Sequence, residues 1–444
     1  MNELFFSTTD RLGVIEQANS VFVRLSGYQR DELVGAPHNI IRHPMMPGAA
    51  FRVMWDTLEA GEPFGAYVHN MASTGSRYDV FATITPLRGG YLSVRARPMC
   101  PDVLQLVDSL YGETWQLEQE LRAQGLSRHQ AAEQGVQKLA GMIAAAGIGT
   151  YNDFLMDALP REVEAREAAG EVCPERPYAT GPLRHMLDTV WQLHQQLGHW
   201  MADLSRLDEQ VNAVQAGARD LLRVSAEASS TAQLISSVEG LPFDFMPLMM
   251  PLQLWTEMDT EVRVVVDQLI TQLDQASASA SRTRFRIALA RLHATMIGNF
   301  IAELIDGLPG ARDAAPAIGL LTQAISEGIG VLEAQSRQHA ALSSQVSEDI
   351  DQVAGLMQMP IDLLGSWIKA SDRELPASIA ELVPRVTQQV QETNWAIGRL
   401  RELGGALHGW TMPDPSPLQH TVAELSHTAA RLARQHNQQP GVGQ

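Results

Sequence analysis

The chain has 444 residues, more than one ordinary domain needs, so at least two domains are expected, each with its own core. Hydrophobic residues make up 45% of the chain and charged residues 19%, which excludes global disorder, and no apolar run approaches the roughly 20 residues of a membrane-spanning helix. The formal net charge of −18 excludes nucleic acid as a favourable partner, because it repels phosphate backbones.

The first 100 residues have the pattern of short strands and short helices. Strands are predicted in LFFSTTD and LGVIEQAN, short helices in SVFVRLSG and RDELVG, and a single helical turn around Ile40, between Pro37 and Pro44. A longer helix is predicted in AAFRVMWDTLEAG, where apolar residues recur at helical spacing. Three strands separated by hairpin turns follow, in PFGAYVHN, SRYDVFATITP and GYLSVRARP. The predicted fold class of residues 1–100 is therefore α+β.

After Arg97 the strand signals stop, and the remaining chain is predicted to be all-α. Residues 101–182 form a helical connector that ends in a Pro-rich linker, PREVEAREAAGEVCPERPYATGP. Residues 183–410 form a long-helix bundle or coiled coil, and residues 411–444 form a polar C-terminal tail that frays. A heptad seam runs along the first long helix, through Val190, Leu193, Leu197, Trp200, Leu204, Leu207, Val211, Val214, Ala218 and Leu221.

The order of elements in residues 1–100 is that of a PAS sensory domain. The amino-acid sequence of this segment makes the match closer than the order of elements alone. The segment from ANSVFVRLSGY to YVHN contains the motif HNIIRHPMMP at residues 38–47. This segment resembles the PAS domains of bacterial aerotaxis receptors, in which a motif of the type HNIIRHPDMP precedes a helix. The resemblance implies a PAS fold that binds flavin adenine dinucleotide (FAD) without a covalent bond and reports redox state or oxygen.

The resemblance also implies which residues form the cofactor site. An FAD site needs a cation for the diphosphate, neutral donors and acceptors for the ring edges, and an apolar slot. Arg42 would pair with the diphosphate, His43 would donate to a polar ligand edge, and Asn70 would reach the ring or its ribityl chain. Tyr67 and Ile84 would add apolar walls. The residues carried over as cofactor-binding are His38, Asn39, Arg42, His43, Trp55, Phe64 and Asn70.

Three residues depart from the family's pattern. Met45 stands where the motif has an acidic residue, Phe64 replaces a Trp, and Asp79 places a charge where the family usually has an aromatic ring. An alternative reading is a haem-based gas sensor, because imidazole is the usual axial ligand and either His38 or His43 could supply it. Arg42 and His43 could also bind only backbone carbonyls, which would leave a ligand-free PAS scaffold or dimerisation protein.

No catalytic or metal-binding motif is found. The sequence lacks a GxxxxGK[ST] loop, a GxSxG elbow and an HExxH pair, so it predicts no enzyme activity and no metal site. Two cysteines, Cys100 and Cys173, cannot form a disulfide framework, and the N-terminus lacks the features of a secretory signal, so a cytoplasmic location is expected.

The sequence therefore predicts a cytoplasmic signal-transduction sensor. The hairpin-tip sequence of chemoreceptors is not found, so the protein that receives the signal stays unidentified. The heptad seam is expected to pack against a second chain or against the helices that begin near Leu252, Ala317 and Ser378. If the resemblance extends to how chemoreceptors transmit signals, a parallel homodimer is expected, because two identical seams satisfy each other.

Overall fold

The computed structural model describes residues 4–236, 246–308, 314–370, 380–381, 383–408 and 413–437. The chain divides into two compact units. Unit 1 contains residues 1–201, 281–332 and 414–444, and unit 2 contains residues 202–280 and 333–413. Because this division cuts through three long helices, it does not test the domain boundaries predicted at residues 100, 182 and 410.

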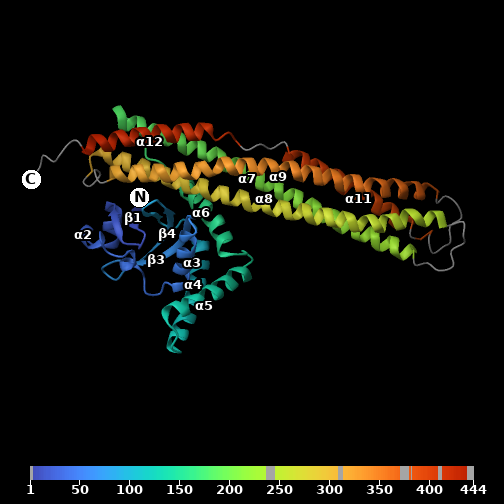
Figure 1. Ribbon diagram of the computed structural model, residues 1–444, viewed down its shortest axis with the longest axis horizontal. Helices are drawn as coiled ribbons and strands as arrows, with labels where there is room; N and C mark the ends of the chain where they lie inside the picture. The colour runs from blue at the N-terminus through green and yellow to red at the C-terminus, as the bar shows by residue number, and fades with distance from the viewer. Residues whose placement is uncertain are drawn as a thin grey trace, which may run out of the picture. The chain divides into compact units, whose positions relative to one another are not determined.

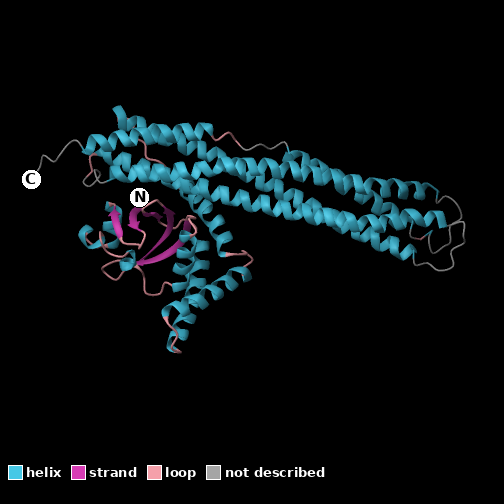
Figure 2. Ribbon diagram, viewed as in Figure 1, coloured by secondary structure: helices cyan, strands magenta, loops and turns pink. Residues whose placement is uncertain are grey.

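The N-terminal part of unit 1 is an antiparallel five-stranded sheet with the strand order β2-β1-β5-β4-β3 (Figure 2). The predicted α+β fold class is confirmed, and every strand and short helix predicted in residues 1–100 is present. The strands are β1 (Leu4–Asp10), β2 (Ile15–Ala18), β3 (Phe64–Met71), β4 (Arg77–Pro86) and β5 (Gly90–Ala96). Between β2 and β3 lie α1 (Ser20–Ser26), α2 (Arg30–Leu33), the 3-10 helix η1 (His38–Ile41) and α3 (Gly48–Glu59).

Three helices follow the sheet and belong to the same unit: α4 (Pro101–Ala123), α5 (Arg128–Ala145) and α6 (Tyr151–Ala168) (Figure 1). The first of them, α4, and the earlier helix α3 each begin at a carboxylate supplied by another helix. Glu162 of α6 accepts hydrogen bonds from the backbone N–H groups of Met99 and Cys100 at the start of α4, at 2.6 and 3.1 Å. Glu118 of α4 accepts from the first two N–H groups of α3, both at 2.8 Å. Free N–H groups at a helix start favour such negative partners.

The Pro-rich linker predicted from Pro160 onward begins later than expected. Pro160 lies inside α6, which continues to Ala168. The helix persists because it buries Phe154, Leu155, Leu159 and Val163 and packs against β3, and this burial outweighs the single hydrogen bond that a proline removes.

The rest of the described chain consists of long helices, as predicted. They are α7 (Gly181–Ser236), α8 (Met246–Asp306), α9 (Ala314–Ala370), α11 (Val383–His408) and α12 (Ser416–Asn437). In unit 1 the seam residues Val190, Leu193 and Leu197 are fully buried, and in unit 2 so are Leu204 and Leu221. Since this burial is reached within one chain, the seam needs no second chain to cover it. The homodimer therefore stays a prediction that would have to use another surface.

The predicted polar tail contains a helix. In α12, apolar residues at steps of three and four, Leu418, Val422, Leu425 and Ala429, are buried, and Glu424 contacts His185 of α7 at 2.8 Å. A narrow apolar stripe is enough to dock a helix whose other positions are polar, which is why composition alone pointed to a frayed tail. Residues 438–444 lie outside the described part. Within the described residues, no helix is long and apolar enough to cross a bilayer.

We expect Glu162→Ala to destabilise unit 1. Glu162 is 4% exposed and also accepts a 2.6 Å hydrogen bond from the Tyr67 hydroxyl, so its removal leaves three donors without an acceptor. The free energy of unfolding, measured by urea titration, should fall by about 3 kcal/mol or more. Glu164→Ala, at an exposed position of the same helix, is the control and should change it little. Equal stabilities of the two variants would contradict this role of Glu162.

We also expect His293 in α8 to make stability depend on pH. It is 1% exposed, its Nε2 atom has no hydrogen-bond partner among the described residues, and burial lowers its pKa to about 3. Between pH 6.5 and 3 the unfolded chain therefore binds a proton that the folded chain does not, and stability falls as pH falls. Urea titrations at pH 7.0 and 5.5 should differ by about 1 kcal/mol less in His293→Gln than in wild type. The exposed His199→Gln should keep the wild-type difference.

Candidate functional site

A cavity of about 280 Å³ lies between one face of the sheet and the segment formed by η1 and α3. This is near the lower end of the range for small-molecule sites, so it suits a ring system better than a complete dinucleotide. Of the residues carried over as cofactor-binding, His38, Asn39, Arg42, Trp55 and Asn70 line the cavity. The other lining residues are Thr9, Leu12, Gly13, Pro37, Phe51, Met54, Leu58, Val68, Ile84, Tyr91, Ser93 and Arg95.

Local backbone structure holds the motif against the sheet. Residues 38–41 form the single 3-10 turn that the neighbouring prolines allow. Arg42 then forms an antiparallel β-bridge with Asn70 of β3, and the His43 N–H donates to the His69 carbonyl at 3.1 Å. These backbone contacts fix Arg42 and Asn70 side by side at the cavity.

Three of the lining residues have a buried donor atom without a hydrogen-bond partner in the described part of the chain: Arg42 through Nε, Asn70 through Nδ2 and Arg95 through Nη1. The lining contains no Asp and no Glu. A buried donor without an acceptor costs about 1–3 kcal/mol. The cavity is thus rich in unsatisfied donors and positive charge, and a ligand with anionic or acceptor groups would satisfy them.

Arg42 and Arg95 each contact the ring of a phenylalanine. The guanidinium carbon of Arg42 is 3.5 Å from the centre of the Phe51 ring, and that of Arg95 is 4.8 Å from the centre of the Phe5 ring. Burial lowers the pKa of both side chains, that of Arg95 to about 10. Arg95 was missed by sequence reasoning. The available signal was a cation inside the strand GYLSVRA, at a position that alternation places on the same face as Tyr91 and Ser93.

His38 is held from both sides of its ring. Its Nε2 atom is 3.1 Å from the Ser7 hydroxyl, and its Nδ1 atom is 3.3 Å from a terminal nitrogen of Arg95. Because a guanidinium can only donate, Nδ1 is the acceptor and His38 is neutral in this arrangement. Burial, followed by the positive charges of Arg95 and Arg42, holds the pKa of His38 well below its ordinary value.

The apolar walls come mainly from α3 and the sheet. Trp55 meets Tyr91 edge to face, with ring centres 5.5 Å apart, and Ile84 lies on the same cavity. Tyr67 faces the opposite side of the sheet, where its hydroxyl binds Glu162. Phe64 does not line the cavity either. It is the first residue of the edge strand β3 and stacks on Tyr151 of α6, with ring centres 5.8 Å apart.

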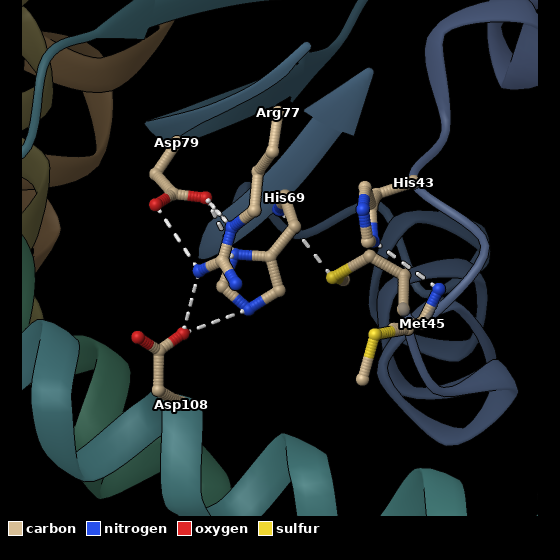
Figure 3. A network of polar contacts seen from close by, with 7 residues as sticks. His43, Met45, His69, Arg77, Asp79 and Asp108 are labelled. Carbon is tan, nitrogen blue, oxygen red and sulfur yellow. Dashed lines mark hydrogen bonds and ion pairs between the residues drawn. The ribbon is translucent and has the colours of Figure 1, made fainter. Parts of the chain in front are cut away.

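His43 also lies outside the cavity lining, and its neighbour His69 belongs to a polar network (Figure 3). The His69 ring is 2.8 Å from Asp79 and 3.1 Å from Asp108 of α4, and Arg77 binds both carboxylates. Asp79 therefore puts no charge into the cavity: the register of β3 and β4 places it opposite His69, on the face toward α4. Burial acts to raise the pKa of Asp79, but hydrogen bonds from Arg77 and His69 outweigh it and lower the pKa.

The described residues contain no group of three or more His, Cys, Asp or Glu side chains that could hold a metal ion. Both cysteines are buried and unpaired. Met45, which replaces the acidic residue of the family's motif, is 49% exposed, and its N–H donates to Nδ1 of His43 at 3.3 Å. This departure from the motif therefore lies at the surface and not in the cavity lining.

Comparisons with known proteins agree with this topology in the N-terminal region. A family model described as PAS fold matches residues 15–92. The chain is 44% identical over 110 residues to the aerotaxis receptor of Escherichia coli strain K12, a match that covers 24% of the chain and 22% of the receptor. The chain thus spans about a fifth of the length of this relative.

Solved structures of PAS and light-oxygen-voltage (LOV) domains are also similar. A PAS domain from Colwellia psychrerythraea is 19% identical, with 21% of this chain and 85% of that chain covered and a TM-score of 0.19. The Aureochrome1 LOV domain is 19% identical, with 24% and 89% covered and a TM-score of 0.22. A family model, the receptor match and the sheet topology together identify the N-terminal fold. The N-terminal region of this chain is a PAS domain, similar in sequence to the matching part of the aerotaxis receptor.

Proposed function

We propose that the PAS domain binds a flavin, FAD, and that the protein is a non-enzymatic sensor of redox state or oxygen. The observation that carries this proposal is the set of buried donors without partners, on Arg42, Asn70 and Arg95, in a cavity whose lining has no carboxylate. A flavin has a planar ring for the apolar walls, carbonyl and nitrogen acceptors for the donors, and a diphosphate for a cation.

The partial exposure of Arg42 suits the diphosphate. Arg42 is less buried than Arg95 and is stacked on Phe51, so it can bind a doubly charged group that stays near solvent. Asn70 is 1% exposed and offers an amide donor to the ring or to the ribityl chain. When bound, the flavin would supply a redox-dependent charge, and the protein side chains would hold it in place.

The alternatives are less well supported. A haem needs a histidine nitrogen free to bind iron, whereas both ring nitrogens of His38 have partners and His43 lies outside the cavity lining. A ligand-free scaffold would leave three donors permanently unsatisfied. We place the sensor in the reducing cytoplasm because both cysteines are unpaired, and we propose that the helical region carries its signal to a partner protein.

We expect the purified protein to be yellow and Arg42→Gln to bind flavin more weakly. Loss of a charge-assisted hydrogen bond to the diphosphate costs about 1.5–3 kcal/mol, which corresponds to a tenfold or larger rise in Kd. Flavin fluorescence quenching measures this affinity. Arg52→Gln is the matched control, because Arg52 lies on α3, is 43% exposed and pairs with Asp56. Colourless wild-type protein, expressed with ample flavin, would refute the proposal.

A further inference from the structure

We propose that Arg95 is a second cationic contact of the ligand and selects a ring edge that carries negative charge. This inference rests on the proposed function. It concerns Arg95 and the ring of the ligand, whereas the proposal above concerns Arg42 and the diphosphate. It arises from the position of Arg95 on β5 and from the partners that surround it.

Arg95 is 7% exposed and has no carboxylate partner among the described residues. Its contacts are the Ser93 hydroxyl at 3.3 Å, the neutral ring of His38 and the face of Phe5. None of these neutralises the guanidinium, and Nη1 has no hydrogen-bond partner in the part of the chain that the structure describes. A buried cation of this kind is costly unless an anion joins it, so the ligand is the group that completes its environment.

The depth of the two arginines indicates which part of the ligand each one meets. Arg42 is partly exposed, so the diphosphate, with two charges to keep hydrated, fits there. Arg95 is buried at the sheet, so it meets the polar edge of the ring. An oxidised flavin ring is neutral. Two electrons and one proton, supplied in the test by dithionite and water, leave the ring with one negative charge, which Arg95 would stabilise.

The test is the midpoint potential of the bound flavin in wild type, Arg95→Gln and Arg95→Lys. In Arg95→Gln the preference for reduced over oxidised flavin should fall at least tenfold, which lowers the potential of this two-electron couple by about 30 mV or more. Arg95→Lys keeps the charge and should stay near the wild-type potential, with weaker flavin binding because the planar fork is lost. Arg88→Gln, at an exposed turn next to β5, is the control for net charge.

Each outcome bears on one proposal or on both. A wild-type potential in Arg95→Gln overturns the role of Arg95 and leaves the flavin sensor intact. If Arg95→Gln fails to fold, Arg95→Lys decides: wild-type flavin affinity in that variant overturns the contact, and weaker affinity supports it. A wild type without flavin overturns the sensor and this inference together.

A second observation, independent of Arg95, concerns the contacts between the cavity segment and α4, the helix that follows the PAS sheet. We infer that one face of α4 responds, through its contacts, to the position of the HNIIRHP motif. Asp108, Trp115 and Glu118 are seven and three residues apart, so they lie on one side of the helix. Each of them binds the motif, the start of α3, or the strand residue that the motif contacts.

The three contacts surround the segment between Arg42 and α3. Asp108 binds the ring of His69, whose carbonyl accepts the N–H of His43 and whose own N–H donates to the Met46 sulfur (Figure 3). Trp115 donates from Nε1 to the Pro44 carbonyl at 3.1 Å. Glu118 binds the first N–H groups of α3, the helix that carries Trp55 and Phe51 to the cavity. If a change of ligand charge moved the motif, the contacts of Asp108, Trp115 and Glu118 that hold α4 would therefore change.

Hydrogen–deuterium exchange of residues 101–123 tests this inference, compared between oxidised and dithionite-reduced protein. We expect reduction to change the exchange of α4 in wild type, and to change it by less than half as much in Asp108→Asn combined with Trp115→Phe. Neither residue lines the cavity, so flavin absorption should be unchanged. Glu113→Gln, which removes an exposed ion pair of α4 with Lys138, is the control and should respond as wild type does.

A full response in the double variant overturns the role of this face. A yellow wild type whose α4 does not respond to reduction also overturns it, while leaving flavin binding in place. If the double variant misfolds, Asp108→Asn alone is measured, and a wild-type response in that variant counts against the inference.

Discussion

The alternation of side chains along β3, β4 and β5 is the constraint on which the rest of the PAS domain depends. Asn70 lines the cavity, and its neighbour His69 faces α4, because successive residues of a strand point to opposite faces. The same alternation puts Ser93 and Arg95 at the cavity and Val94 on the other face. Adjacent residues of one strand, Asn70 and His69, therefore contact the cavity and α4, with no loop between them to absorb a displacement.

The two faces of this sheet solve the burial of charge in different ways. On the face toward α4, the cation Arg77 meets the carboxylates of Asp79 and Asp108, which also contact the His69 ring, so opposite charges compensate each other within the protein. On the cavity face, Arg42 and Arg95 rest on aromatic rings and meet no carboxylate of the residues that the structure describes. A cation–π contact recovers only part of what a desolvated guanidinium loses. The uncompensated positive charge of these two arginines lines the cavity, where a ligand could neutralise it, whereas a structural ion pair is already neutralised within the protein.

Much of the fold was predictable from sequence, because glycine and proline mark the boundaries of its elements. Pro37, Pro44 and Pro47 confine η1 and set the start of α3, and the hairpins follow from their turn residues. The face on which a strand residue lies was harder to predict, since a shift of one residue in register exchanges the two faces. The face of Asp79 depends on this register, which pairs it with His69, whereas alternation alone turns Tyr67 away from the face of Asn70, three residues further along the same strand.

Long-range partners were beyond sequence reasoning for a related reason. Nothing near Glu162 or Glu118 in the chain shows that each caps a helix other than its own, because the partners lie about 60 to 70 positions away. The place of Arg95 at the site likewise follows only from tertiary packing, because packing brings β5 beside η1 and Arg95 to His38. The motif identified the segment that matters, and tertiary packing determined which of its residues reach the cavity.

The two buried carboxylates also limit how α4 can respond. Glu162 holds the backbone at the start of α4, while Asp108, Trp115 and Glu118 hold positions further along the same helix. On the inference drawn above, a change at the motif would alter the later contacts and leave the contact with Glu162 in place, because Glu162 binds neither the motif nor α3. A packed helix that is held at its start and released further along would favour a small rigid-body tilt about that start, the kind of motion that packed interfaces transmit.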